Sequence, residues 1–103
     1  MVTDRQWRLM GLGLKAGSLA IGSAGVRAGL QRGEVALVVM AEDRSPRTEE
    51  KVGRLAGHRG VAVLIGPSSQ DLGRRLGRPP VQAVGVRDRA LAAGMVGTAD
   101  TDT

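Results

Sequence analysis

The chain contains no cysteine, no phenylalanine and no tyrosine, and Trp7 is the single aromatic residue among its 103 residues. Without cysteine, neither a disulfide bond nor a thiolate zinc site can form. The absence of cysteine also fits a reducing compartment. We therefore expect a cytoplasmic protein without a thiolate metal site. We also expect no other metal and no cofactor.

Long apolar segments are also missing. No apolar run approaches the roughly 18 residues that a membrane-spanning helix needs, and residues 1–8 lack the pattern of a signal peptide. We therefore expect a soluble chain with no membrane partner. Apolar residues still make up 42% of the sequence, which is typical of a folded α/β protein and not of a disordered chain.

Acidic residues are in the minority. The sequence has 15 lysines and arginines but 10 aspartates and glutamates, which gives a formal net charge of +5. Lysine occurs only at positions 15 and 51, so the other cations are arginines. Arginine presents planar, forked donors that suit phosphates and favour a nucleic-acid partner. An arginine-rich surface also follows from genomic base composition or from a need for solubility. Because one tryptophan offers almost no stacking surface, nucleic-acid binding would rest on backbone N–H groups, arginine and shape.

Helix-like and strand-like segments alternate along the chain. Helices are predicted at 4–16, 23–33, 45–60, 68–77 and 88–96, and strands at 19–21, 35–41, 61–65 and 81–86. This alternation predicts an α/β fold in which helices cover both faces of a single sheet, a three-layer α/β/α sandwich. We expect one domain over residues 1–97 and a flexible polar tail over residues 98–103.

Most of these helices carry a recognisable start or stop signal. The expected N-cap residues are Ser23, Ser45, Ser68 and Asp88. Pro46 suits the first helical position after Ser45, and the expected helix ends are Gly33, Gly60 and Gly77. The apolar runs Val35–Ala41 and Val61–Ile65 are both expected to form buried strands. In the first helix, Trp7, Met10 and Leu14 define an apolar face that Leu9 and Leu12 broaden.

Enzyme and nucleotide-site motifs are weak. Gly11–Ala16 matches the string G-x-G-x-x-A, but the buried strand that must precede this motif is absent. His58 is the only histidine, and its place at a predicted helix C-terminus is favourable without any further role. Glu42 and Asp43 follow a buried strand, but no third metal ligand lies nearby, and Asp43 can simply cap the following turn. We therefore do not expect an enzyme.

Three stretches, residues 12–33, 36–52 and 63–86, together resemble the ribosomal-protein L-seven-Ae and L-thirty-e superfamily. The likeness is greatest to its short bacterial YlxQ-like members. The most specific pieces are Lys15-Ala16-Gly17 ahead of Gly22, Ala41-Glu42-Asp43 after a buried strand, and Leu72-Gly73 followed by Gly77.

The resemblance implies a mixed four-stranded sheet and a non-enzymatic protein that binds structured RNA, either RNA kink-turns or ribosomal RNA. It also implies a ribosomal protein or a translation factor as a further partner. The RNA-reading surface of the family maps onto residues 22–27, 42–44 and 78–81. The candidate RNA-binding residues are Lys15, Gly22, Ser23, Ala24, Gly25, Arg27, Asp43, Arg44 and Arg78.

One segment departs from the pattern of the family. Kink-turn binders typically begin their second helix with Gly-Thr-Asn-Glu, followed by a lysine, and those side chains read tandem G·A pairs. This chain has Gly22-Ser23-Ala24-Gly25, with Ala28 near the position of the lysine. We therefore expect RNA contact dominated by the backbone. The alternative is a protein–protein module in which this small-residue helix start packs against a partner.

Overall fold

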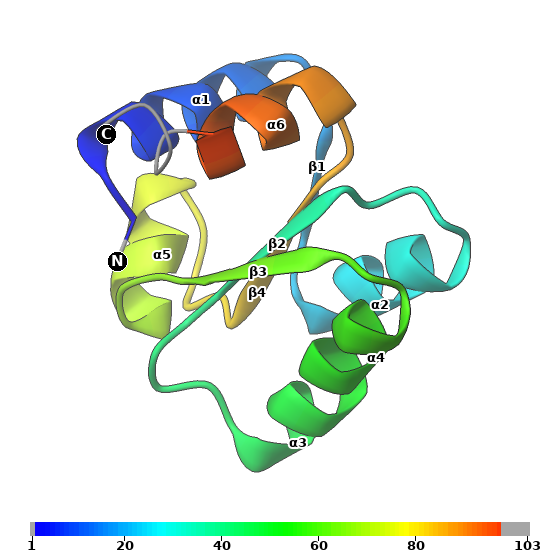
Figure 1. Ribbon diagram of the computed structural model, residues 1–103. Helices are drawn as coiled ribbons and strands as arrows, with labels where there is room; N and C mark the ends of the chain where they lie inside the picture. The colour runs from blue at the N-terminus through cyan, green and yellow to red at the C-terminus, as the bar shows by residue number, and fades with distance from the viewer. Residues whose placement is uncertain (1, 98–103) are drawn as a thin grey trace.

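The computed structural model describes residues 2–97 (Figure 1). The predicted tail at 98–103 lies outside the described residues. In chain order the elements are α1 (Asp4–Lys15), β1 (Leu19–Ile21), α2 (Ser23–Gln31), β2 (Leu37–Met40), α3 (Pro46–Thr48), the π-helical segment η1 (Glu49–Gly53), α4 (Arg54–His58), β3 (Ala62–Ile65), α5 (Ser69–Arg75), β4 (Ala83–Val86) and α6 (Arg89–Gly97).

The strands form one mixed sheet in the order β1-β4-β2-β3, which confirms the expected four-stranded arrangement. β2 and β3 run parallel, with Leu37 opposite Ala62. β4 runs antiparallel to both of its neighbours, so that Ala83 lies opposite Met40 and Val84 lies opposite Ile21. The ends of β1 and β2 and the start of β4 therefore meet at the same edge of the sheet.

Helices cover both faces of the sheet, as Figure 1 shows, and the three-layer sandwich is confirmed. Side chains alternate between the faces along a strand. Leu37 and Val39 of β2 accordingly pack with α1, α5 and α6, whereas Val38 and Met40 pack with α2, η1 and α4. The second of these clusters, on the face of Val38 and Met40, holds α2 next to η1 and α4.

The two apolar runs predicted as buried strands differ in the structure. All four residues of β2 are buried. β3 is the outermost strand of the sheet, beside β2, and it is largely exposed, with Val63 at 37% and Ile65 at 40%. The prediction of a second buried strand over Val61–Ile65 was therefore wrong. An apolar sequence indicates a strand, but it does not fix the position of that strand in the sheet.

The predicted caps Ser45, Ser68 and Asp88 are confirmed, since each accepts a hydrogen bond from a backbone N–H three residues later. The single helix predicted after Ser45 is interrupted by the π-helical turn η1. Such turns are rare and change which side chains face a neighbouring helix.

A hydrogen-bonded cap that the sequence reading had missed begins α1. Thr3 and Gln6 form a capping box, and the buried Gln6 side chain also donates to the Met95 carbonyl at 2.9 Å, tying α1 to α6. Trp7 packs half-buried against the core with the Arg75 guanidinium 4.6 Å from its ring centre. Leu12, expected on the apolar face, is instead 56% exposed.

Candidate nucleic-acid interface

The three segments expected to form an interface meet at one edge of the sheet. The Gly22 N–H donates to the Ala83 carbonyl at 2.9 Å, and the Ala41 N–H donates to the Gln82 carbonyl at 2.9 Å. The Gln82 side chain then accepts a hydrogen bond from the Ser45 N–H at 2.8 Å. Gln82, which the sequence reading did not single out, thus joins the segment before β4 to the start of α3.

The start of α2 has no side-chain cap. Gly22 is its N-cap residue, with φ 95° and ψ 152°, so the prediction that Ser23 caps this helix was wrong. This backbone conformation is essentially restricted to glycine, and it makes Ser23 the first helical residue. The first helical bond of this turn runs from the Val26 N–H to the Gly22 carbonyl at 3.0 Å. The backbone N–H groups of residues 23–25 consequently remain available to a ligand.

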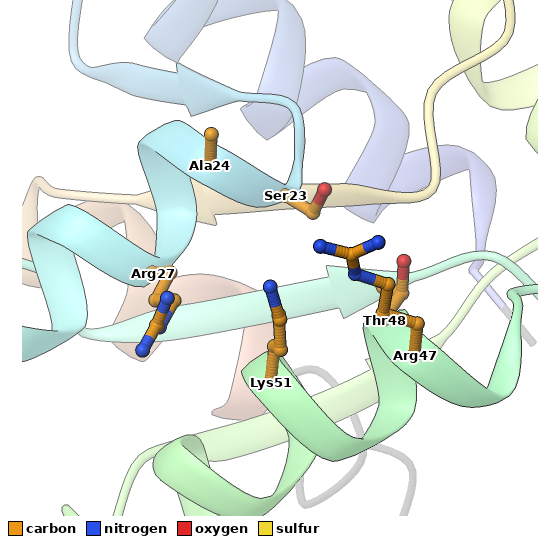
Figure 2. Close-up of a pocket in the computed structure, with 6 residues that line it drawn as sticks. All are labelled: Ser23, Ala24, Arg27, Arg47, Thr48 and Lys51. Atoms are coloured by element: carbon orange, nitrogen blue, oxygen red, sulfur yellow. The ribbon is translucent and has the colours of Figure 1, made fainter.

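Beside this helix start lies a hollow of about 310 Å³ between α2 and the α3–η1 segment. Arg27 lines it from α2, and Arg47 and Lys51 point toward α2 from the opposite helix (Figure 2). We call it the α2–α3 groove. Its lining residues are Ser23, Ala24, Arg27, Arg47, Thr48 and Lys51.

The cations of the α2–α3 groove are not neutralised. Within residues 2–97 the ion pairs join Arg44 to Glu49, Arg54 to Glu50 and Arg74 to Asp71, and none involves Arg27, Arg47 or Lys51. Three like charges gathered around one hollow repel one another, and an anion placed between them relieves that repulsion. The groove is therefore suited to a phosphate, which the N–H groups of residues 23–25 can also reach.

Two other predicted site residues are engaged within the protein. The Asp43 carboxylate accepts from the Ser69 N–H at 2.7 Å and from the Ser69 hydroxyl at 3.2 Å, so it secures the start of α5 and does not cap the turn that follows it. Arg44 pairs with Glu49 and donates to the Ala41 carbonyl at 3.1 Å. Both side chains shape the loop after β2.

The remaining predicted cations occupy different places. Arg78 is exposed in the segment before β4, and its N–H donates to the Gly73 carbonyl at 2.8 Å. Gly73 packs so closely under residues 78–79 that no side chain fits there. Lys15 is exposed at the end of α1, before β1, whereas Gly22 follows β1. The structure therefore does not bring Lys15 to the edge where the other segments meet.

Sequence reasoning missed Arg47 and Lys51. The available signal was their i,i+4 spacing next to the buried positions Thr48 and Val52, which places both cations beside the face of the helix that packs on the core. That they oppose Arg27 depends on how this helix packs against α2, which no local pattern encodes.

Neither a metal centre nor a membrane span is found in the part of the chain that the structure describes. No group of three or more histidine, aspartate or glutamate side chains in residues 2–97 is placed to hold a metal ion. Over the same residues, no helix has the length and apolar character required to cross a membrane.

A small α/β/α sandwich with an uncapped helix start beside a cationic groove has the features of a compact binding domain for anionic partners. Residues 8–94 match the Ribosomal protein L7Ae/L30e/S12e/Gadd45 family, and the chain belongs to this family. No curated protein matches the chain in sequence.

Two solved structures show the same fold. A protein of unknown function from Bacillus halodurans is 26% identical with a TM-score of 0.85, and the match covers 95% of this chain and 99% of that one. The Giardia lamblia 15.5kD RNA binding protein is 20% identical with a TM-score of 0.76, and the match covers 96% of this chain and 88% of that one.

Proposed function

We propose that this chain is a non-enzymatic RNA-binding protein that holds structured RNA, ribosomal or kinked, in the α2–α3 groove. The observation that carries the proposal is the set of three unpaired cations, Arg27, Arg47 and Lys51, that line one hollow. Membership of a family that includes ribosomal proteins supports it, as does the shared fold of the Giardia lamblia RNA binding protein.

The chemistry of the groove favours the RNA backbone over the bases. Arginine forks and free helix N–H groups both suit phosphate oxygens. Ala24 and Gly25 are exposed and small, so a phosphate can approach the backbone of α2 closely. Arg78 is proposed as an additional contact from the segment before β4, whereas Asp43 and Arg44 position the loops around the groove.

We expect low sequence specificity. Related kink-turn binders are expected to read bases with side chains that this chain lacks at Ala24, Gly25 and Ala28. Phosphate contacts then supply most of the affinity, and each one adds about 0.9 to the slope of log affinity against log salt for a duplex. The affinity for a kink-turn RNA and for a plain duplex should therefore be similar, and both should fall steeply with salt.

Titration of both RNAs by fluorescence anisotropy at several salt concentrations tests this proposal. The triple variant Arg27→Gln, Arg47→Gln, Lys51→Gln should lower the salt slope by about 2–3 and weaken binding at least tenfold. Arg5→Gln, at an exposed position of α1 on the other side of the sheet, is the matched control. Unchanged binding by the triple variant, or tight binding that ignores salt, would contradict the proposal.

The rival proposal is a protein partner at the start of α2. Such a partner would need apolar surface there, but the exposed large apolar side chains within residues 2–97 are Leu12, Val63, Ile65 and Val96, on α1, β3 and α6. None of them lines the α2–α3 groove. RNA therefore remains the better-supported ligand for this surface.

A further inference from the structure

A second hollow continues the α2–α3 groove along the same two helices. It measures about 410 Å³ and shares Arg27, Arg47 and Lys51 with the first hollow. It is extended by Gln31 at the end of α2 and by residues of the opposite helix as far as His58. We call this continuation the α2–α4 groove.

The charge of the α2–α4 groove is also predominantly positive. Arg54 joins the three shared cations, and Glu50 is the only acidic residue in the lining. Arg54 and Glu50 form an ion pair at 3.4 Å, but their side chains are 73% and 70% exposed. An exposed pair of this kind contributes little energy, so Arg54 can exchange Glu50 for a phosphate at small cost.

The length of the combined groove sets the size of its occupant. From Arg47 to His58 the helix advances by roughly 16 Å at about 1.5 Å per residue. Phosphates of one strand follow one another at about 3.4 Å along a DNA duplex axis, so a groove of this length faces several phosphates. A single phosphate or a mononucleotide would occupy only one end of it.

We infer that the α2–α4 groove is a second RNA contact, which holds the sugar–phosphate backbone of a duplex strand as it leaves the α2–α3 groove. The inference rests on the proposed RNA-binding function and extends it. It assigns Arg54 as a phosphate contact, Gln31 and His58 as hydrogen-bonding groups, and Glu50 as a residue that weakens binding.

Stem length provides the test. Two hairpin RNAs, one with a stem of about three base pairs, which is shorter than the groove at about 3.4 Å per phosphate, and one with a stem of two turns, are titrated against the full chain. Arg54→Gln should weaken binding of the long hairpin by about twofold to fivefold, the range expected for one exposed charge contact. It should also lower the salt slope for that hairpin by about one and leave the short hairpin unchanged.

A second variant is expected to change the affinity for the long hairpin in the opposite direction. Glu50→Gln removes the single carboxylate from the groove, and we expect it to strengthen binding of the long hairpin only. Both substituted side chains are exposed, so folding should be kept. Arg5→Gln again serves as the matched control, because it removes a cation without touching either groove.

The outcomes separate the inference from the function on which it rests. If Arg54→Gln and Glu50→Gln leave the ratio of long to short binding unchanged while the Arg27, Arg47, Lys51 triple variant weakens both hairpins, the second contact is refuted and RNA binding stands. If neither hairpin binds, both the second contact and the proposed RNA-binding function are refuted.

Polyglutamate, titrated in the same way, represents an acidic protein segment. If it binds with a dependence on Arg54 and hairpin length has no effect, the α2–α4 groove binds acidic protein segments, and the inference is wrong.

Discussion

The two helices on either side of the α2–α3 groove begin in opposite ways. α2 starts after a glycine with no side-chain cap, which leaves the N–H groups of residues 23–25 free. α3 starts after Ser45, whose hydroxyl accepts the Thr48 N–H at 3.1 Å, and Pro46 has no N–H to satisfy. Two helix starts at one edge of the sheet thus differ in what they leave for a ligand.

The charges near the two helix starts do not add to this difference. The first turns of α2 and α3 both lack acidic residues, and Glu49 and Glu50 lie in η1, where Glu49 pairs with Arg44. The contrast between the two helix starts therefore lies in their caps. The comparison teaches that a side chain satisfies a backbone N–H at the start of α3, whereas no side chain caps the start of α2.

The largest effect is expected from giving α2 the base-reading side chains that kink-turn binders carry and this chain lacks. In the variant Ala24→Asn, Gly25→Glu, Ala28→Lys, each restored base contact should add about 1–3 kcal/mol of discrimination. The backbone permits the change, since Gly25 has no positive φ and a Cβ there would meet only the Ala20 methyl at 4.0 Å. Ala24 and Ala28 lie one turn apart and share a face.

The measurement is the affinity for a kink-turn RNA relative to the same RNA without its G·A pairs. We expect the native chain to show a ratio near one and the variant to raise it by at least tenfold. The variant Ala24→Ser, Gly25→Ala, Ala28→Gln changes the same three positions without adding base-reading side chains, so it controls for helix propensity. A well-folded restored variant whose ratio stays at the native value would show that α2 does not present a kink-turn reading frame.

Much of the fold follows from local sequence. The caps at Ser45, Ser68 and Asp88 are correct because each side chain accepts the backbone N–H three residues later. Ser23 fails because Gly22, with φ 95°, takes the N-cap position before it. The central strand β2 is correct because seven consecutive apolar residues cannot be placed at the surface without cost. The same reasoning fails for β3, because its exposure depends on which strand occupies the edge of the sheet.

The candidate site was predicted less completely, for a physical reason. Gly22 and Arg27 could be proposed because the family resemblance maps its RNA-reading surface onto residues 22–27. Arg47 and Lys51 become groove residues only after the α3–η1 segment packs against α2. Arg44 was predicted as an RNA contact, but the structure pairs its side chain with Glu49.

A smaller effect is expected from substituting the glycine cap of α2. Gly22→Ala should destabilise the protein by about 1–3 kcal/mol, because φ 95° is strained for any residue with a Cβ, although no neighbour lies within 4 Å of that atom. Denaturant unfolding followed by circular dichroism measures the loss. Gly25→Ala is the control in the same turn and should be neutral or stabilising by up to about 1 kcal/mol. Equal losses at both positions would mean that the turn at Gly22 is not needed to start α2.

The smallest effect belongs to the helix that is already capped. Ser45→Ala removes the acceptor of the Thr48 N–H and should cost about 1 kcal/mol, which urea unfolding reports as a lower midpoint with an unchanged slope. Ser23→Ala is the matched control: Ser23 has no capping hydrogen bond, so the change should stay within about 0.5 kcal/mol. RNA affinity should be preserved in Ser45→Ala, because Ser45 does not line the α2–α3 groove. If Ser23→Ala proved the more damaging of the two, α2 would be the side-chain-capped helix, and the contrast between the two helix starts would be reversed.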